Sequence, residues 1–176
     1  MNGSQTFETR VLPHLDAAYN LARWLLRDDH AADDAVQDAL MRAMRYIASL
    51  REDEARAWLM GIVRNTCFSI LEKLRKGPEW VEFDEEMFDA SVHASGTAGS
   101  DPAVHLQRLR TKSCVDAAIR ALSPPLREVI VLRELEGLDY AEIAVIADVP
   151  LGTVMSRLSR ARDRLRDALS PSRLDT

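Results

Sequence analysis

The stretch DYAEIAVIADVPLGTVMSRLSRARDRLR, residues 139–166, decides the fold of the C-terminal part of this chain. Its first residue and the glutamate three positions later have the spacing of a capping box, which predicts a short helix over 140–147. A proline and a glycine then indicate a turn at 148–152, and a longer helix follows from 153 to about 169. A helix, a tight turn and a second helix form the arrangement that places a recognition helix in the major groove of DNA.

The longer helix separates an apolar stripe from a basic face. At about 100° per residue, one narrow stripe collects four apolar residues: Val154, Leu158, Ala161 and Leu165. The opposite side collects three arginines and two hydroxyl residues: Thr153, Ser156, Arg157, Arg160 and Arg164. Arginine and hydroxyl side chains suit contacts to guanine and to phosphate. An ordinary amphipathic surface helix would share this pattern, but the preceding short helix and turn favour a DNA-reading face. Arg162 and Arg166 lie away from that face and are predicted to point into solvent.

Further start and stop signals divide the chain into three parts. Ser123–Pro125 predicts a helix start with a hydroxyl cap and prolines in the first turn, and Gly137 marks that helix's end. We expect helices over residues 5–76, a linker over 77–101 and helices again over 102–170. The predicted fold class is all-α, with two small helical domains joined by a flexible acidic linker, the C-terminal domain being the helix-turn-helix.

The linker carries the excess negative charge. The 176-residue chain has a net charge of -5, from 28 acidic and 23 basic residues. Residues 82–101 hold six of the acids and no lysine or arginine, so the flanking parts are close to neutral. Gly77–Pro78 stops the first helical block, and Asp101–Pro102 opens the next with a capping acid and a proline. The acidic total therefore does not exclude a nucleic-acid partner, because the charge is segregated.

One N-terminal helix has a polar face with two open interpretations. Its apolar stripe is predicted to comprise Val36, Leu40, Ala43, Met44 and Ile47. The opposite side carries Asp34, Asp38 and Met41, with Gln37 at the border. A solvated charged face accounts for these residues by periodicity alone, and an exposed methionine among them slightly favours a partner surface.

A second N-terminal helix, from about Ala55 to Lys76, is basic and contains a single acid after its first residue. Its polar positions include Arg56, Arg64, Asn65 and Lys73. Such a helix could follow phosphates or could simply keep the protein in solution, and both interpretations remain open here. Trp24 and Trp80 are predicted to be packing residues.

Several classes of protein are excluded by composition. Cys67 and Cys114 are too few and too far apart for a disulfide framework or a zinc site, and no two of the four histidines have ligand spacing on one helix. We therefore predict no metal site, no cofactor and no enzymatic activity. No apolar run approaches the roughly 20 residues that span a bilayer, and no signal peptide is present, so we expect a cytoplasmic protein without membrane insertion.

Three segments resemble one family in order and spacing. LSPPLREVIVLRELEGLDYAEIA (122–144), with GTVMSRLSRARDRLR (152–166), closely resembles the fourth conserved region of the extracytoplasmic-function sigma factors of the sigma-70 family. DDAVQDALMRA (33–43) resembles their core-polymerase-binding helix. RAWLMGIVRN (56–65) resembles the segment that engages the -10 promoter element.

The resemblance implies roles for the faces already described. Contacts to the clamp helices of the polymerase's largest subunit would come from Asp34, Gln37, Asp38 and Met41. The melted -10 strand would be held by Arg56, Arg64, Asn65 and Lys73. The -35 duplex would be read by Thr153, Ser156, Arg157, Arg160 and Arg164. The loop at 49–54 would read a flipped base, and the acidic linker would imitate nascent RNA near the active centre.

The same resemblance implies a promoter-specificity subunit of bacterial RNA polymerase that starts transcription of a stress- or signal-responsive regulon. Its partners would be core polymerase, including the flap of the second subunit, promoter DNA and an anti-sigma factor. A stand-alone helix-turn-helix regulator is an alternative that leaves the first helical block without a role. A sigma-mimicking adaptor is another, but it should have lost the basic face of residues 153–164.

Overall fold

The computed structural model describes residues 3–51, 54–76 and 102–170. The predicted linker, Trp80 and the tip of the loop before the basic helix lie outside these ranges. Within them every regular element is helical, as predicted. In chain order the elements are α1 (Gly3–Arg10), η1 (Leu12–His14), α2 (Leu15–Leu26), α3 (Asp29–Arg45), η2 (Ile47–Ser49), α4 (Ala55–Lys76), α5 (Pro102–Ala121), α6 (Pro124–Ile130), η3 (Val131–Leu135), α7 (Tyr140–Ala147) and α8 (Leu151–Ala168).

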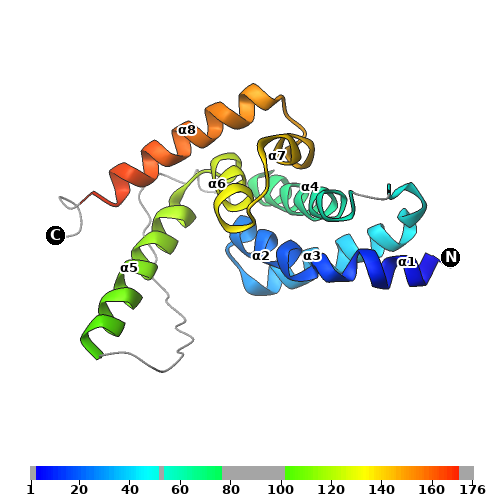
Figure 1. Ribbon diagram of the computed structural model, residues 1–176, viewed down its shortest axis with the longest axis horizontal. Helices are drawn as coiled ribbons and strands as arrows, with labels where there is room; N and C mark the ends of the chain where they lie inside the picture. Colours follow the sequence, from blue (N-terminus) through cyan, green and yellow to red (C-terminus); the bar gives the residue numbers. More distant parts are fainter. Residues whose placement is uncertain (1–2, 52–53, 77–101, 171–176) are drawn as a thin grey trace.

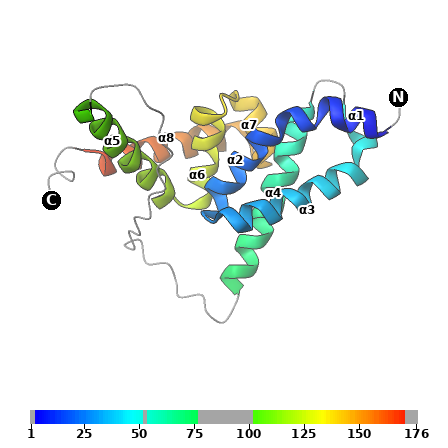
Figure 2. The ribbon, with the colours of Figure 1, turned by 90° about the horizontal axis from the view of Figure 1, so that it is seen from below.

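The N-terminal helices α2, α3 and α4 pack against one another (Figures 1 and 2). A sharp reversal joins α2 to α3. Arg27 ends α2 in the left-handed conformation (φ 59°), and the Asp28 side chain then caps α3 by accepting a 2.7 Å hydrogen bond from the Ala31 N–H. Because the reversal takes only two residues, α2 and α3 lie side by side and can share one apolar interface.

The predicted apolar stripe of α3 is wrong in one position. Met44 is 57% exposed, whereas the buried stripe runs through small residues: Ala32, Ala35, Val36, Ala39 and Ala43. Alanines allow neighbouring helices to approach closely, so the buried face centres on them. Met44 lies more than a right angle away from that centre and therefore reaches solvent.

The C-terminal helices begin with a correction at Ser123. Its hydroxyl makes no capping hydrogen bond; its backbone carbonyl instead accepts from the N–H groups of Leu126 (3.0 Å) and Arg127 (2.9 Å). The two prolines that follow have no N–H to donate, so the first available donor is the N–H of Leu126, which already lies within reach of the Ser123 carbonyl. The helix then continues into the π-helical turn η3 and ends at Gly137 (φ 69°), the predicted end.

The helix-turn-helix is confirmed. Asp139 and Glu142 form a complete capping box, each side chain making a 2.8 Å bond with the other residue's backbone N–H. α8 begins at Leu151, two residues earlier than predicted, because the Pro150 carbonyl already accepts from Thr153 (2.9 Å). α7 and α8 pack against each other and against α6, and α7 also packs against η3.

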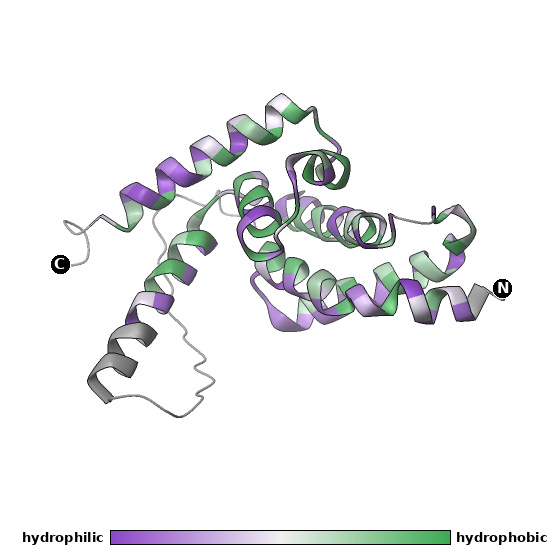
Figure 3. Ribbon diagram, viewed as in Figure 1, coloured by the Kyte–Doolittle hydropathy of each residue, from purple (hydrophilic) through white to green (hydrophobic). Residues whose placement is uncertain are grey.

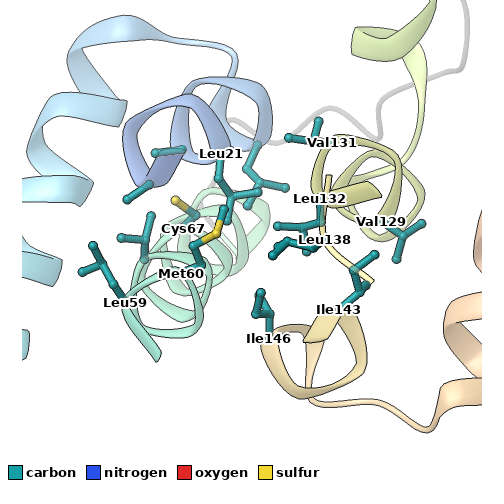
Figure 4. Packing of buried hydrophobic residues seen from close by; sticks show 14 of the residues in the cluster. Leu21, Leu59, Met60, Cys67, Val129, Val131, Leu132, Leu138, Ile143 and Ile146 are labelled. Atoms are coloured by element: carbon teal, nitrogen blue, oxygen red, sulfur yellow. The ribbon is translucent and has the colours of Figure 1, made fainter. Parts of the chain in front are cut away.

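A single hydrophobic core joins the N-terminal and C-terminal helices, an arrangement that the sequence did not predict. Side chains of α2 and α4, such as Leu21 and Met60, face Leu132 and Leu138 across this core (Figure 4). α7 lies against α4 and α6 lies against α2 (Figure 1). The predicted packing role of Trp24 is confirmed, since it lies half-buried against this core. The two halves are thus closed onto each other.

Arg127 strengthens this closed arrangement from inside. It is only 3% exposed, and its guanidinium donates five hydrogen bonds of 2.6–3.3 Å to backbone carbonyls. The acceptors are Trp24 and Leu25 in α2, and Ile119, Arg120 and Leu122 at the end of α5. Helix C-termini attract cations. Burial lowers the pKa of Arg127 to about 9, so the group still stays charged at neutral pH.

Candidate nucleic-acid and polymerase interfaces

α8 presents a polar face along the outside of the C-terminal half, as its hydrophilic bands in Figure 3 show. Its apolar stripe is buried as predicted at Val154, Leu158 and Ala161. Ser156, Arg160 and Arg164 are exposed and Thr153 is half-buried at the start of the same face. These four residues form one polar strip along the first four turns of the helix.

Arg157 does not lie on this exposed strip, so the prediction of its orientation is wrong. Its side chain is 20% exposed and turns inward, with Nη1 3.8 Å from Oε2 of the fully buried Glu128 on α6. Neither of these two atoms has a hydrogen-bond partner within the described ranges. A buried carboxylate attracts the nearest guanidinium, and the helical angle alone could not reveal it.

Two exposed residues of α8 were not assigned by sequence reasoning. Met155 is 53% exposed, and Ser159 is exposed one turn further along. Both lie on the outward side of the helix, next to Ser156. Their helical angles of about 200° and 240°, with Thr153 at zero, would have placed them on the wet side. Arg162 and Arg166 reach solvent as predicted, paired with Glu134 and Asp163 at 2.8 Å each.

The four basic or polar residues predicted on α4 fall into two groups. Asn65 and Lys73 are exposed. Arg56 and Arg64 are half-buried, because the C-terminal helices cover their part of α4. The structure therefore does not leave the four side chains on one open surface.

Arg64 is held by a buried carboxylate of the C-terminal half. Its Nε donates to Oε1 of Glu128 at 2.6 Å, and its guanidinium lies 4.2 Å from the centre of the Phe68 ring. Burial raises the pKa of Glu128, while the charge and hydrogen bond of Arg64 act against that rise. Both side chains of this ion pair are largely shielded from solvent, with exposed fractions of 17% for Arg64 and 0% for Glu128.

Arg56 makes a second connection of the same kind. Its Nη2 donates to the Glu136 carbonyl at 2.7 Å and lies 3.0 Å from the Glu136 carboxylate. The other carboxylate oxygen of Glu136 accepts a 2.6 Å bond from Asn20 of α2. Glu136 is the residue that directly follows the π-helical turn η3.

The predicted polymerase-binding face of α3 is open. Asp34 and Gln37 are exposed, Met41 is 61% exposed, and Asp38 forms a 2.8 Å surface ion pair with Arg42. Met44 (57% exposed) lies about 60° around α3 from Met41 and extends this face, which sequence reasoning missed. Tyr46, the residue directly after α3, is also exposed at 58%. Large apolar side chains that are exposed on one face of a helix are typical of a protein-binding surface.

In the part of the chain that the structure describes, no cluster of histidine, cysteine or acidic residues could hold a metal ion. Burial raises the pKa of the Cys67 thiol to about 12, so this cysteine is protonated and unreactive at neutral pH. No helix of the described ranges is long and apolar enough to cross a membrane.

Two family models match the chain in the order of its two halves. The model described as sigma-70 region 2 matches residues 11–77, and the one described as sigma-70, region 4 matches residues 112–165. The first range contains α2, α3 and α4, and the second contains α7 and all but the last three residues of α8. Together they include every candidate residue on α3, α4 and α8.

Individual proteins agree with this match. The RNA polymerase sigma-H factor of Pseudomonas aeruginosa is 32% identical over 95% of this chain and 88% of its own length. An ECF RNA polymerase sigma factor, SigE of Mycolicibacterium smegmatis, is 32% identical over 97% of this chain, which spans 64% of that relative. The solved sigma factor RpoE of Bartonella quintana, in complex with the anti-sigma factor NepR, is 29% identical with a TM-score of 0.73, covering 94% of this chain and 97% of that one. This chain therefore belongs to the sigma-70 family and, within it, to the extracytoplasmic-function sigma factors, the non-catalytic subunits that give bacterial RNA polymerase its promoter specificity.

Proposed function

We propose that this sigma factor recognises its promoters through two separate surfaces, one in each half of the chain. The observation that carries the proposal is the helix-turn-helix of α7 and α8, whose outer strip offers Thr153, Ser156, Arg160 and Arg164 to a -35 duplex. Arginine forks bind guanine edges or phosphates, and the hydroxyls add shorter contacts. Arg157 joins this surface only after leaving Glu128.

The second surface is α4, which binds the melted -10 strand. Asn65 and Lys73 are already exposed for this role, and Arg56 and Arg64 complete it when the C-terminal half moves away. Core polymerase docks on the open face of α3 through Asp34, Gln37, Asp38 and Met41. The acidic and apolar character of that face suits a basic partner surface with an apolar centre.

We further propose that the protein acts in the cytoplasm and is controlled by an anti-sigma factor, as part of a signal-responsive regulon. The Bartonella relative was solved with such a partner, and its fold superposes over both halves of this chain. The domain boundaries that we propose are 5–76 for the first domain, 77–101 for the linker and 102–170 for the second domain. The two family models match residues 11–77 and 112–165.

In vitro transcription with core polymerase over a promoter library tests the proposal directly. We expect specific initiation from promoters that share a -10 and a -35 element, and little binding of the free chain to duplex promoter. Tight sequence-specific binding by the free chain, with no gain from core polymerase, would instead identify a stand-alone regulator. The recovered sequences also define the two elements for later experiments.

Replacing Arg160 by alanine should relax the choice of base at one -35 position. Arg160 is exposed, with its Nε 3.3 Å from the Ser156 carbonyl, so nothing buried is lost. Loss of one base contact costs about 1–3 kcal/mol. The measurement is holoenzyme affinity for a set of -35 variants at several salt concentrations.

The matched control for this experiment is Arg166→Ala, which removes an equal charge from the last turn of α8, about 120° around the helix from Arg160, where Arg166 pairs with Asp163. It should leave base preference unchanged. A uniform loss over all sequences, with a reduced salt dependence, would assign Arg160 to a phosphate instead of a base.

A further inference from the structure

Two glutamates of the C-terminal half hold two arginines of α4. We call this pair, Glu128 and Glu136, the acidic clasp. Glu128 binds Arg64 at 2.6 Å, and Glu136 binds Arg56 at 3.0 Å through its carboxylate. Both arginines belong to the set proposed above to bind the melted -10 strand. The same cationic groups therefore have two possible anionic partners.

The Glu136 connection runs only between the two halves. In the part of the chain that the structure describes, its carboxylate contacts Arg56 of α4 and Asn20 of α2, at 3.0 and 2.6 Å. Its side chain is 9% exposed. The Arg56 side chain is 36% exposed, so the pair is partly buried and salt screens it less than a fully exposed pair. Removing Arg56 would leave the Glu136 carboxylate poorly solvated and without its cation.

The hydrogen bond from Arg64 to the Glu128 carboxylate is shorter than the one from Arg56 to the Glu136 carboxylate, at 2.6 Å against 3.0 Å. The Glu128 carboxylate, however, also faces a second arginine. One carboxylate oxygen binds Arg64 of α4, and the other faces Arg157 of α8 at 3.8 Å. The clasp thus contacts one arginine from the proposed -10 surface and one from the recognition helix at the same carboxylate. When Arg64 leaves, Glu128 has a second cation available within its own half.

We propose that the acidic clasp is an internal competitor for promoter DNA: its carboxylates occupy Arg56 and Arg64 in place of the phosphates of the -10 strand. This inference rests on the proposed -10 role of α4. Carboxylate and phosphate oxygens make the same charge-assisted bonds to a guanidinium, so one arginine cannot satisfy both. The closed form therefore cannot bind the -10 strand through Arg56 and Arg64, and opening it releases both side chains.

The clasp also explains how core polymerase can raise the affinity for DNA. If only a small fraction of free chains is open, the apparent affinity for single strands falls by that fraction. A partner that binds the open form removes this cost without contacting the arginines. The face of α3 that is proposed to bind polymerase lies outside the clasp, so both can act in one complex.

The test compares full-length Glu136→Gln with the unaltered chain. The readouts are binding to a fluorescent oligothymidine, which offers phosphates without any promoter sequence, and energy transfer between dyes on the exposed positions Arg45→Cys and Val145→Cys. Cys114→Ser removes the half-buried native thiol, and Cys67 is buried and does not react. We expect about tenfold tighter strand binding and reduced energy transfer, as one charge-assisted contact is lost.

Glu134→Gln is the matched control. It removes the same charge two residues away, where Glu134 pairs with Arg162 inside the C-terminal half. It should change neither readout. Adding Arg56→Gln to Glu136→Gln should abolish the gain in strand binding while the dyes stay apart.

The outcomes separate the two proposals. Unchanged energy transfer and unchanged strand binding in Glu136→Gln would overturn the clasp itself. Reduced energy transfer without any gain in strand binding would show that α4 does not bind the strand, which overturns the -10 role and the competition that depends on it. Equal gains in Glu134→Gln and Glu136→Gln would reduce the effect to net charge and also overturn the clasp.

Discussion

Asp38→Lys is expected to abolish binding to core polymerase while the chain stays folded. Asp38 is exposed at 44% on the open face of α3 and makes only a surface ion pair with Arg42, so its replacement costs the fold little. At a basic partner surface, a reversed charge replaces attraction by repulsion. We expect at least about a 100-fold loss of affinity, or roughly 2.7 kcal/mol, measured by fluorescence anisotropy with purified core enzyme.

Glu72→Lys on α4 is the matched control for this reversal. Glu72 also forms an exposed pair with a base four residues later, Lys76, at 2.6 Å. The hydrogen bond from Lys76 lowers the pKa of Glu72, as expected for a surface pair. The Glu72→Lys variant should bind core polymerase as the unaltered chain does. Normal core binding by Asp38→Lys would remove Asp38 from the polymerase surface and leave the role of its neighbours to be tested one by one.

Arg127→Ala is expected to destabilise the protein more than any surface substitution. The truncation removes the donor of the Trp24 and Leu25 carbonyls in the other half and of the Leu122 carbonyl. The carbonyls of Ile119 and Arg120 keep the Leu122 N–H and the Arg27 guanidinium as donors. Each buried acceptor without a partner costs about 1–3 kcal/mol. With partial rescue by water, we expect a total loss of about 3 kcal/mol. For a chain of this size that corresponds to a fall in Tm of roughly 6–12 °C, measured by circular dichroism.

Arg127→Lys should recover part of this loss, since lysine keeps the charge near the helix C-termini but cannot reproduce the fork of five donors. Arg166→Ala, at a 74% exposed arginine, should leave Tm within about 2 °C, a small fraction of the stability of the fold. If Arg127→Ala melted at the temperature of the unaltered chain, the carbonyl contacts would not be what holds the two halves closed.

Much of the local structure could be predicted from residues a few positions apart. The capping box of Asp139 and Glu142 and the stop at Gly137 depend on short-range hydrogen bonds or backbone freedom. The apolar stripe of α8 depends only on helical period. Such features are determined within one or two turns of chain, so one sequence is enough to find them.

The errors share a different cause. Ser123 lost its predicted hydroxyl bond because its own carbonyl satisfies the first donors after the prolines. Met44 was placed on the apolar face because periodicity treats every apolar residue alike, whereas packing selected the alanines of α3. Arg157 was placed outward because its helical angle is that of a wet residue, although Glu128 lies buried beneath it.

The sequence by itself determined the helices, the helix-turn-helix and the identity of the charged faces, because each follows from residues that are neighbours in the chain. Only the tertiary structure decided that the two halves share one core and that Arg56 and Arg64 meet Glu136 and Glu128. These partners lie 80 and 64 positions apart. The sequence gives the sign of each charged side chain. Which opposite charge that side chain contacts depends on how the helices pack, and the burial of apolar surface between the helices determines this packing.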